Sequence, residues 1–303
     1  MIERIFVQSL DEFNYTSSVN FYKKNETETG VVCMKGLEIL FYNFDKIFVC
    51  DTSTRNLLLS SDICKKAETF NTIKNIANNI SKSVYTQSDL DINKTHIYQY
   101  TFHALAKDMC EKIEPLYLPK KNDYFFVKEK LKNINKKIVT INGRNLEGDR
   151  AGRNNNLIET IKVLINSGYY VLNCTIPNPM LADNFDTESY AELLEEEIQD
   201  YSKNVSYFLN SDCLISVADS GGITNHICTG ANIILFGDGG WVDNPEFGYE
   251  SKSLYDVSKS FKPTFHANNN TEVLDILLNL EKPKEVKFFD EDKIVYLWNI
   301  KKY

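Results

Sequence analysis

The sequence is poor in arginine and histidine and lacks paired cysteines and long apolar runs, and each shortage excludes a class of protein. No apolar run reaches the roughly 18 residues of a membrane-spanning helix. Seven cysteines are scattered without a CxxC pair, and four histidines are too dispersed for a zinc-ligand pattern. The N-terminal residues lack the apolar segment of a signal peptide, so we expect a cytoplasmic protein with reduced, buried thiols.

The charge balance is acidic and excludes a further class. Lys and Arg total 34 against 42 Asp and Glu, which gives the 303-residue chain a formal net charge of −8. A general nucleic-acid binder needs a basic surface to neutralise phosphates, so we expect no nucleic-acid partner. The length and a hydrophobic content of 43% suit a globular protein of about two domains.

The few arginines are unevenly placed. The sequence has five, Arg4, Arg55, Arg144, Arg150 and Arg153, of which three fall within ten residues. The other basic residues are lysines, which lack the planar guanidinium fork. Because that fork binds carboxylate or phosphate through two hydrogen bonds at once, the cluster indicates an anion site.

In the second half of the chain, short apolar runs alternate with segments of helical spacing. The apolar runs predict four strands, at Lys137–Ile141, Tyr169–Cys174, Cys213–Val217 and Asn232–Phe236. We expect the first helix to be capped by Asn156 and to end at Gly168. We expect residues 187–209 to be helical, with the glutamates at 195–197 on a solvated face. This alternation predicts an α/β fold with a parallel sheet and flanking helices.

The first half gives a weaker pattern. It predicts strands at Arg4–Ser9, Val31–Met34, Lys46–Cys50 and His96–Thr101, and helices over Asp62–Ser83 and Ala104–Ile113. The segment 115–123, with two prolines and a lysine pair, is typical of a linker. We therefore expect a small or irregular N-terminal domain over residues 1–125 and a C-terminal domain over residues 126–285. A tail, residues 286–303, is expected to pack back on the N-terminal domain.

Three unusual loops follow the predicted strands of the second half. They span Asn142–Asn156, Asp219–Gly222 and Gly237–Trp241. Nine of the 13 glycines lie in or beside them: Gly143, Gly148, Gly152, Gly221, Gly222, Gly230, Gly237, Gly239 and Gly240. Ligands of an open parallel sheet bind at the carboxyl ends of its strands, so these loops are the candidate site.

The composition of these loops favours a diphosphate ligand. Glycines let the backbone approach an anion closely, and a helix N-terminus offers unpaired N–H groups. Arginines supply charge-assisted hydrogen bonds from the other side. His226, one turn into the helix after the glycine pair, is a further candidate. The alternative is structural: the glycines form tight turns, the arginines pair with surface acids, and His226 is a partly buried histidine.

Other motifs are weak. Asp89–Asp91 and Asp290–Asp292 match the short DxD pattern of metal-dependent sugar transferases, but neither follows a convincing buried strand. No Walker-type lysine loop and no GxGxxG pattern is present. We therefore expect no metal site and no tightly bound cofactor.

Two stretches resemble a known family. Residues 139–174 read VTINGRNLEGDRAGRNNNLIETIKVLINSGYYVLNC and resemble bacterial glycosyltransferases, in which a strand ends in Arg and an RN pair precedes the helix. Residues 208–241 read FLNSDCLISVADSGGITNHICTGANIILFGDGGW. They resemble the D-x-x-x-x-S-x-SG region of the same proteins and the SD-x-G-x-x-H-x-A region of heptosyltransferases. The similarity covers roughly residues 137–245 and implies a GT-B-like fold of two Rossmann-like domains.

The resemblance implies roles for particular residues. Arg144 would contact the donor phosphates and take part in catalysis, assisted by Arg150 or Arg153. The phosphate would lie at the helix start, and the third loop would edge the nucleotide pocket. The implied donor-binding residues are Arg144, Arg150, Arg153, Asp219, Ser220, Gly221, Gly222, His226, Asp238 and Gly239. His103, Asp45 and Glu12 are available as the catalytic base, and His103 is the residue we select.

The expected function is therefore a metal-independent glycosyltransferase of polysaccharide biosynthesis. Its donor would be a nucleotide-diphosphate sugar, its acceptor a glycan, and a homodimer is compatible with the sequence. Two alternatives stay open. Asp219-Ser-Gly-Gly222 equals the DSGG of UDP-N-acetylglucosamine 2-epimerases, although Thr224-Asn225-His226 stands where their acids follow. A catalytically idle sugar-nucleotide-binding module would use the same loops.

Overall fold

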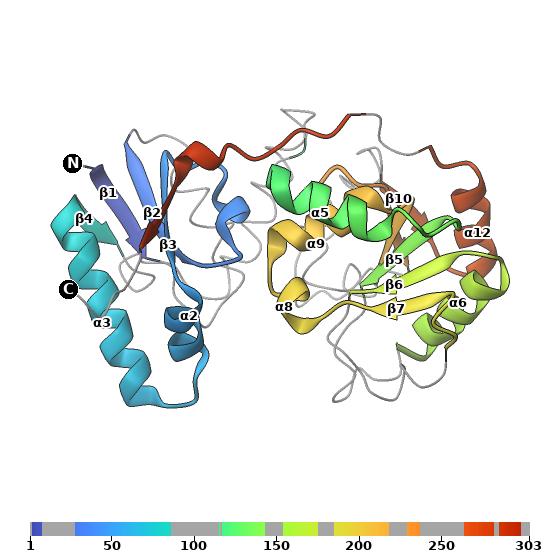
Figure 1. Cartoon of the computed structure of the whole chain (residues 1–303), viewed down its shortest axis with the longest axis horizontal. Coiled ribbons are helices and arrows are strands. Elements are labelled where there is room, and N and C mark those ends of the chain that lie inside the picture. Colours follow the sequence, from blue (N-terminus) through green and yellow to red (C-terminus); the bar gives the residue numbers. More distant parts are fainter. Residues whose placement is uncertain are drawn as a thin grey trace, which may run out of the picture. The chain divides into compact units, whose positions relative to one another are not determined.

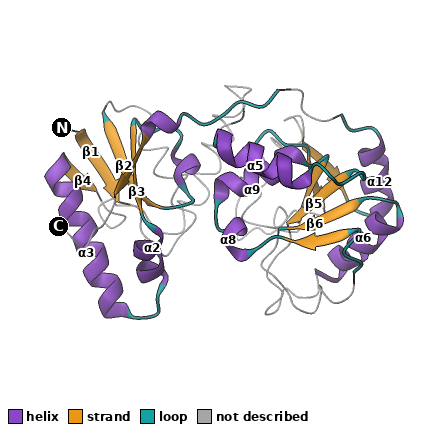
Figure 2. Ribbon diagram, viewed as in Figure 1, coloured by secondary structure: helices purple, strands orange, loops and turns teal. Residues whose placement is uncertain are grey.

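The chain folds into two compact α/β units, each built on one parallel sheet (Figures 1 and 2). The computed structural model describes residues 2–7, 28–85, 115, 117–142, 154–174, 185–217, 229–236, 264–281 and 285–297. Unit 1 comprises Met1–Leu105 with Phe289–Tyr303, and unit 2 comprises Ala106–Phe288. The expected α/β class with parallel sheets is confirmed. The expected division at residue 125 falls inside unit 2, which begins at Ala106.

Unit 1 has a five-stranded sheet with the order β11-β3-β2-β1-β4, and all its strand pairs are parallel. Its strands are β1 (Ile2–Val7), β2 (Thr29–Met34), β3 (Lys46–Cys50), β4 (Ser81–Tyr85) and β11 (Ile294–Leu297). Its helices are η1 (Glu38–Phe41), α2 (Thr52–Leu59), α3 (Ile63–Ile80) and η5 (Glu291–Lys293).

The edge strand β11 comes from the far end of the chain. It pairs with β3 in the register Ile294 with Ile47 and Leu297 with Cys50. Lys46 Nζ donates to the carbonyl oxygen of Asp292 at 3.2 Å, and Lys293 Nζ donates to that of Tyr42 at 3.2 Å. The C-terminal segment thus belongs to the sheet of unit 1.

The core of unit 1 forms where α2 and α3 cover the sheet. Leu58 of α2 and Ile73 and Ala77 of α3 are buried against apolar strand residues such as Ile5 and Phe48. Both helices start at an aspartate cap: Asp51 accepts from the Thr54 amide at 2.7 Å, and Asp62 from the Lys65 amide at 3.1 Å. The expected helix over residues 62–83 ends at Ile80 instead, because the chain turns extended at Ser81 and enters β4.

Unit 2 has a six-stranded parallel sheet with the order β10-β9-β8-β5-β6-β7. Its strands are β5 (Ile138–Asn142), β6 (Tyr170–Asn173), β7 (Tyr190–Glu192), β8 (Cys213–Val217), β9 (Ile233–Phe236) and β10 (Thr264–Ala267). Its helices are α5 (Lys121–Leu131), α6 (Asn154–Asn166), α8 (Glu195–Ile198), α9 (Tyr201–Asn210) and α12 (Asn270–Leu278).

Alternation along the central strands divides their side chains between two helical layers. Ile141 and Ile215 face Ile161 of α6 and Val273 of α12 in one buried cluster. On the opposite face, α9 contacts β8 and packs against α5 (Figure 1). The sheet is therefore covered on both sides, as the apolar character of its strands requires. No described helix is long and apolar enough to cross a membrane.

Three expectations for unit 2 were wrong in detail. Residues 187–209 contain strand β7 as well as α8 and α9. Helix α5 begins at Lys121, inside the expected linker. The sequence did not indicate this helix because its apolar residues 124–127 are contiguous and give no helical period. Helix α6 begins at Asn154 rather than after Asn156. Its last residue is Asn166, and Gly168, whose φ is +87°, terminates it as expected.

Candidate functional site

The sheet of unit 2 reverses its order between β5 and β8. Along the chain, β6 and β7 are added on one side of β5, and β8, β9 and β10 on the other. Asn142 at the end of β5 lies beside Ser216 of β8. Connections that leave the two sides of such a reversal diverge to opposite faces and leave a crevice at the carboxyl ends of the strands, where α/β proteins bind ligands. The carboxyl ends of β5 and β8 are therefore the candidate site.

The glycine- and arginine-rich loops all begin at the carboxyl end of this sheet. Residues 143–153 join the end of β5 to α6, the loop with Asp219 follows Val217 of β8, and the third loop follows Phe236 of β9. Asn142, Ser216 and Leu235 form one row across the three strands. Neighbouring strands lie about 4.8 Å apart, so the three loops start within roughly 10 Å of one another.

The predicted site residues themselves lie outside the described residues. They are His103, Arg144, Arg150, Arg153, Asp219, Ser220, Gly221, Gly222, His226, Asp238 and Gly239. All except His103 follow β5, β8 or β9 within the loops or the segment just after them. Their individual roles stay predictions. The strands β5, β8 and β9 that precede them belong to the described fold.

The structure describes one of the candidate bases, Asp45. Asp45 immediately precedes β3, so it lies at the amino edge of the unit 1 sheet, opposite the edge at which ligands bind. Its Oδ2 accepts hydrogen bonds from the Thr29 amide at 2.9 Å and the Thr29 hydroxyl at 3.4 Å. Asp45 therefore joins β2 to β3. Glu12 and His103 fall outside the described residues.

Two polar residues at the carboxyl ends of β5 and β8 were not predicted from the sequence. Asn142 is the last residue of β5, and Ser216, which is fully buried, is its partner on β8. They lie on the same face of the sheet because directly opposed residues of parallel strands share a face. The available signal was a polar side chain at the carboxyl end of each apolar run, KIVTIN and CLISV.

A second polar group joins the neighbouring strand ends. Tyr190 of β7 donates from its hydroxyl to Glu192 Oε1 at 3.0 Å and accepts from Asn173 Nδ2 of β6 at 3.0 Å. Asn173 and Tyr190 are both buried. Burial raises the pKa of Tyr190, so its hydroxyl stays protonated and serves as a donor. These bonds fix the carboxyl ends of β6 and β7 beside the candidate crevice.

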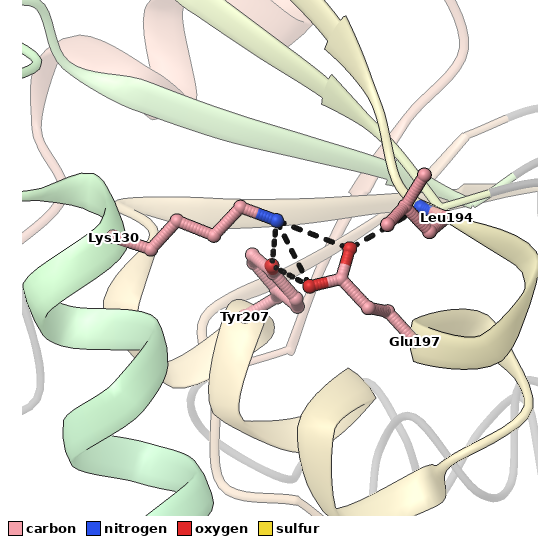
Figure 3. A network of polar contacts seen from close by, with 4 residues as sticks. All are labelled: Lys130, Leu194, Glu197 and Tyr207. Atoms are coloured by element: carbon pink, nitrogen blue, oxygen red, sulfur yellow. Dashed lines mark hydrogen bonds and ion pairs between the residues drawn. The ribbon is translucent and has the colours of Figure 1, made fainter.

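A third polar group lies among the helices on the α5–α9 face (Figure 3). Glu195 and Glu196 are exposed as expected, but Glu197 is 4% exposed, which corrects the expectation of a solvated face for that residue. Lys130 Nζ lies 2.9 Å from Glu197 Oε1 and 2.9 Å from the Tyr207 hydroxyl, which donates to the same Oε1 at 2.7 Å. The Leu194 amide donates to Glu197 Oε2 at 3.2 Å.

The protonation states in this group are set by its contacts. Burial works to raise the pKa of Glu197, but hydrogen bonds from Lys130, Tyr207 and the Leu194 amide outweigh it and leave the pKa below its usual value. Burial, reinforced by Glu197, raises the pKa of Tyr207. The carboxylate is therefore ionised and the phenol neutral at pH 7. The group holds α5 against α8 and α9.

The described cysteines are reduced, and four of the five are buried as expected. Cys33, Cys50, Cys174 and Cys213 are buried, and Cys64 on α3 is exposed. Burial raises the pKa of the Cys174 and Cys213 thiols and that of Cys50 to about 12. Since the thiolate is the nucleophile, these three side chains are unreactive packing residues.

Within the described ranges, no three His, Cys, Asp or Glu side chains gather to hold a metal ion. Asp290 of the second DxD triplet accepts from the Asp292 amide at 3.2 Å and so caps η5. The Asp89–Asp91 triplet lies outside the described residues. The second triplet therefore has a local structural role.

No family model and no curated protein matches the sequence. Solved structures similar to this one include the glycosyl transferase family 9 protein of Veillonella parvula DSM 2008, with 13% identity and a TM-score of 0.47 over 91% of this chain and 97% of that one. Another is the ADP-heptose LPS heptosyltransferase II of E. coli, with 10% identity and a TM-score of 0.47 over 91% and 99%. A third, assigned as a UDP-N-acetylglucosamine 2-epimerase of Listeria monocytogenes, has 10% identity and a TM-score of 0.41 over 94% and 93%.

Proposed function

We propose that the chain is a glycosyltransferase that moves a sugar from a nucleotide-diphosphate donor to a glycan acceptor, without a metal ion. One observation supports this most strongly. The segment with three arginines and the segment with the Asp219–Gly222 tetrad follow β5 and β8, the strands on either side of the order reversal. Loops at that position are the ones an α/β sheet uses to bind nucleotides.

The proposed reaction places a negative charge where these loops can neutralise it. An acceptor hydroxyl attacks the anomeric carbon, a base takes its proton, and the bond from that carbon to the diphosphate breaks. Arg144 and its neighbours, with the N–H groups near Gly221 and Gly222, would stabilise the departing nucleoside diphosphate. The same groups would replace a metal ion as the counter-charge.

Two segments of the unit 1 sequence have a composition that suits the acceptor. Residues 8–27 follow β1 and residues 86–105 follow β4, and these two strands flank the order reversal of the unit 1 sheet. Both segments are free of glycine and arginine and rich in Ser, Thr, Asn and Tyr. Hydroxyl and amide groups recognise sugar hydroxyls by hydrogen bonds, and His103 in the second segment is the proposed base.

The first test is a thermal-shift screen of the whole chain with UDP, GDP, ADP and CMP sugars. A ligand at 100 times its dissociation constant stabilises the folded state by about 2.7 kcal/mol, which is a shift of several degrees. A donor that shifts the melting temperature is then incubated with glycan acceptors, and the products are separated by mass.

The outcomes separate the candidate functions. Release of the nucleoside diphosphate together with a heavier acceptor supports transfer. An epimerised sugar nucleotide without an acceptor product would instead support the epimerase that the DSGG tetrad at residues 219–222 indicates. A thermal shift without any turnover would leave a binding module, and no shift with any of the four would contradict the proposed donor site.

A further inference from the structure

Helix α5 presents adjacent aromatic rings and several lysines to solvent. Phe125 is 47% exposed and Phe126 is 55% exposed. Lys121, Lys128 and Lys132 are exposed on the same helix or at its C-terminal cap. Positions 121, 125, 128 and 132 are separated by four, three and four residues, so they form one stripe along the helix. Phe126 lies about 100° around the helix from Phe125, beside this stripe, and Glu129 follows both rings by one turn. We call Lys121, Phe125, Phe126, Lys128 and Lys132 the α5 face.

The rings of this face are held in place from below. Phe125 lies 5.5 Å from Tyr124 and 5.9 Å from Phe288, measured between ring centroids, and Tyr124 lies 5.5 Å from Phe288. Lys203 Nζ of α9 lies 6.0 Å from the centroid of Phe126. The Lys130–Glu197–Tyr207 group fixes the same helix to α8 and α9 (Figure 3). The exposed rings therefore project from a rigid support.

The charge around this face is opposite to that of the rest of the chain. Residues 120–137 contain seven lysines and two acids, a local charge of +5, so the remaining residues sum to −13 in a chain of −8. One of the two acids, Glu129, is paired with Lys132. Among the described residues, Lys121 and Lys128 form no ion pair. Lys130 is likewise paired, with Glu197. Lys121 and Lys128 are therefore the α5 lysines whose charge no described acid neutralises.

We propose that the α5 face docks the protein on an anionic lipid surface. Phenylalanine rings enter the boundary between headgroups and acyl chains, while lysines reach the headgroups through their long apolar stems. Lysines near a membrane surface are attracted to anionic lipids, and exposed aromatic residues beside them add an apolar contribution to the binding free energy. An otherwise acidic protein would be oriented by this arrangement, with unit 2 held against the membrane through α5.

A second copy of the chain fits this face less well. A two-fold dimer through α5 would place two basic faces together, and like charges would repel. Docking of the α5 face on a different, acidic surface of another copy would be a heterologous contact, which closes into a ring only for particular rotations and otherwise gives open chains of molecules. A planar array of negative charges has neither difficulty.

The test is co-sedimentation of the full chain with vesicles. Vesicles of phosphatidylcholine and phosphatidylglycerol in equal parts are compared with pure phosphatidylcholine. We expect binding to the anionic vesicles that weakens as salt is raised. Phe125→Ser with Phe126→Ser and, separately, Lys121→Gln with Lys128→Gln should each weaken partitioning about fivefold per residue changed. The loss from the lysine variant should fade at high salt, and the loss from the phenylalanine variant should not.

Matched controls keep the result interpretable. Ile63→Ser with Leu278→Ser removes two other exposed apolar side chains, 80% and 70% exposed, and Lys35→Gln with Lys74→Gln changes the net charge equally. Both controls should bind like the parent. Circular dichroism checks that each variant is folded, and the lysine pair stays informative if the phenylalanine pair is not. No binding to anionic vesicles at low salt, equal binding by all variants, or a dimer that the α5 variants abolish would overturn the proposal.

Discussion

The two units share a topology and differ in the composition of the segments after their strands. In each, the first strand has its second strand on one side and its fourth on the other, so β1 and β4 correspond to β5 and β8. The segments after β1 and β4 contain no glycine and no arginine, whereas residues 143–153 and 218–228 hold three arginines and five glycines. The shared topology supplies an edge suited to a ligand, and the loop composition determines which ligand chemistry each edge favours.

The largest effect is expected from adding a side chain at Gly222, in the glycine-containing segment that distinguishes unit 2 from unit 1. A valine there would occupy the position proposed for a phosphate and restrict φ, so Gly222→Val should abolish the thermal shift given by the donor. The matched change in unit 1 is Ser88→Val in the segment after β4, which should leave that shift intact. If Gly222→Val does not fold, Ser220→Ala and Asp219→Asn test the same loop. A folded Gly222→Val that keeps the parent's shift would contradict the proposed phosphate position.

The next effect concerns the arginine cluster. Arg144→Ala should weaken donor binding or turnover by about 2–4 kcal/mol, the scale of one preorganised charge-stabilising group. Arg144→Lys should restore little, because lysine lacks the planar fork. Arg4→Lys in unit 1 is the control and should leave kcat/KM unchanged. Full activity of Arg144→Lys would remove the argument for a bidentate phosphate contact.

A third change tests another difference between the units: unit 1 is built from two separate segments of the chain, whereas unit 2 is built from one. Deleting residues 289–303 removes β11 and exposes the paired edge of β3, while unit 2 keeps every described strand. We expect hydrogen–deuterium exchange to rise strongly in β3 and β2, with a loss of about 2 kcal/mol or more in the stability of unit 1. Exchange in β5 and β8 should not change. Unchanged protection of β3 would show that β11 contributes little to the sheet.

A smaller effect is expected from the ion pair between buried Glu197 and exposed Lys130 in unit 2. The pKa of Glu197 is below its ordinary value of 4.5 in the folded protein, so its stabilising effect is complete above pH 4.5 and is lost as the pH falls through the folded value. Glu197→Gln should cost about 1–3 kcal/mol at pH 7, from hydrogen bonds to a charged group, and the difference from the parent should shrink in acid. Denaturant titrations across pH measure it. The exposed neighbour provides the control: Glu195→Gln should show almost no difference at any pH.

The smallest expected effect is that of a chelator. If arginines and backbone N–H groups neutralise the leaving diphosphate, then EDTA should leave the transfer rate unchanged. Complete loss of activity, restored by manganese or magnesium, would indicate a metal-dependent enzyme and would direct attention to Asp89 and Asp91 in unit 1.

The sequence predicted the parts of the fold that depend on local pattern. The strand Cys213–Val217 was placed to the residue, because an apolar run between polar residues is a local signal. Helix α5, with contiguous apolar residues, and the three-residue strand β7 were missed because they give no period. The burial of Glu197 was also missed, since it depends on Lys130, a residue 67 positions earlier in the chain.

The candidate site was predicted as a set of loops, and its polar neighbours were not. Glycines and arginines stand out in composition, so the loops after β5, β8 and β9 could be found without a structure. Asn142 and Ser216 could not be paired in this way, because their proximity follows from the strand order and the register of two strands 71 or more residues apart. The same holds for Tyr190 and Asn173, whose hydrogen bond depends on β6 and β7 being adjacent.

The origin of β11 has a consequence for how the protein is made. Translation produces β1 to β4 before unit 2, but β3 lacks its outer neighbour until β11 has left the ribosome. All of unit 2 is synthesised in the interval and is able to fold there as a unit. Unit 1 therefore has an unpaired strand edge while unit 2 is synthesised, and such an edge promotes aggregation during biosynthesis.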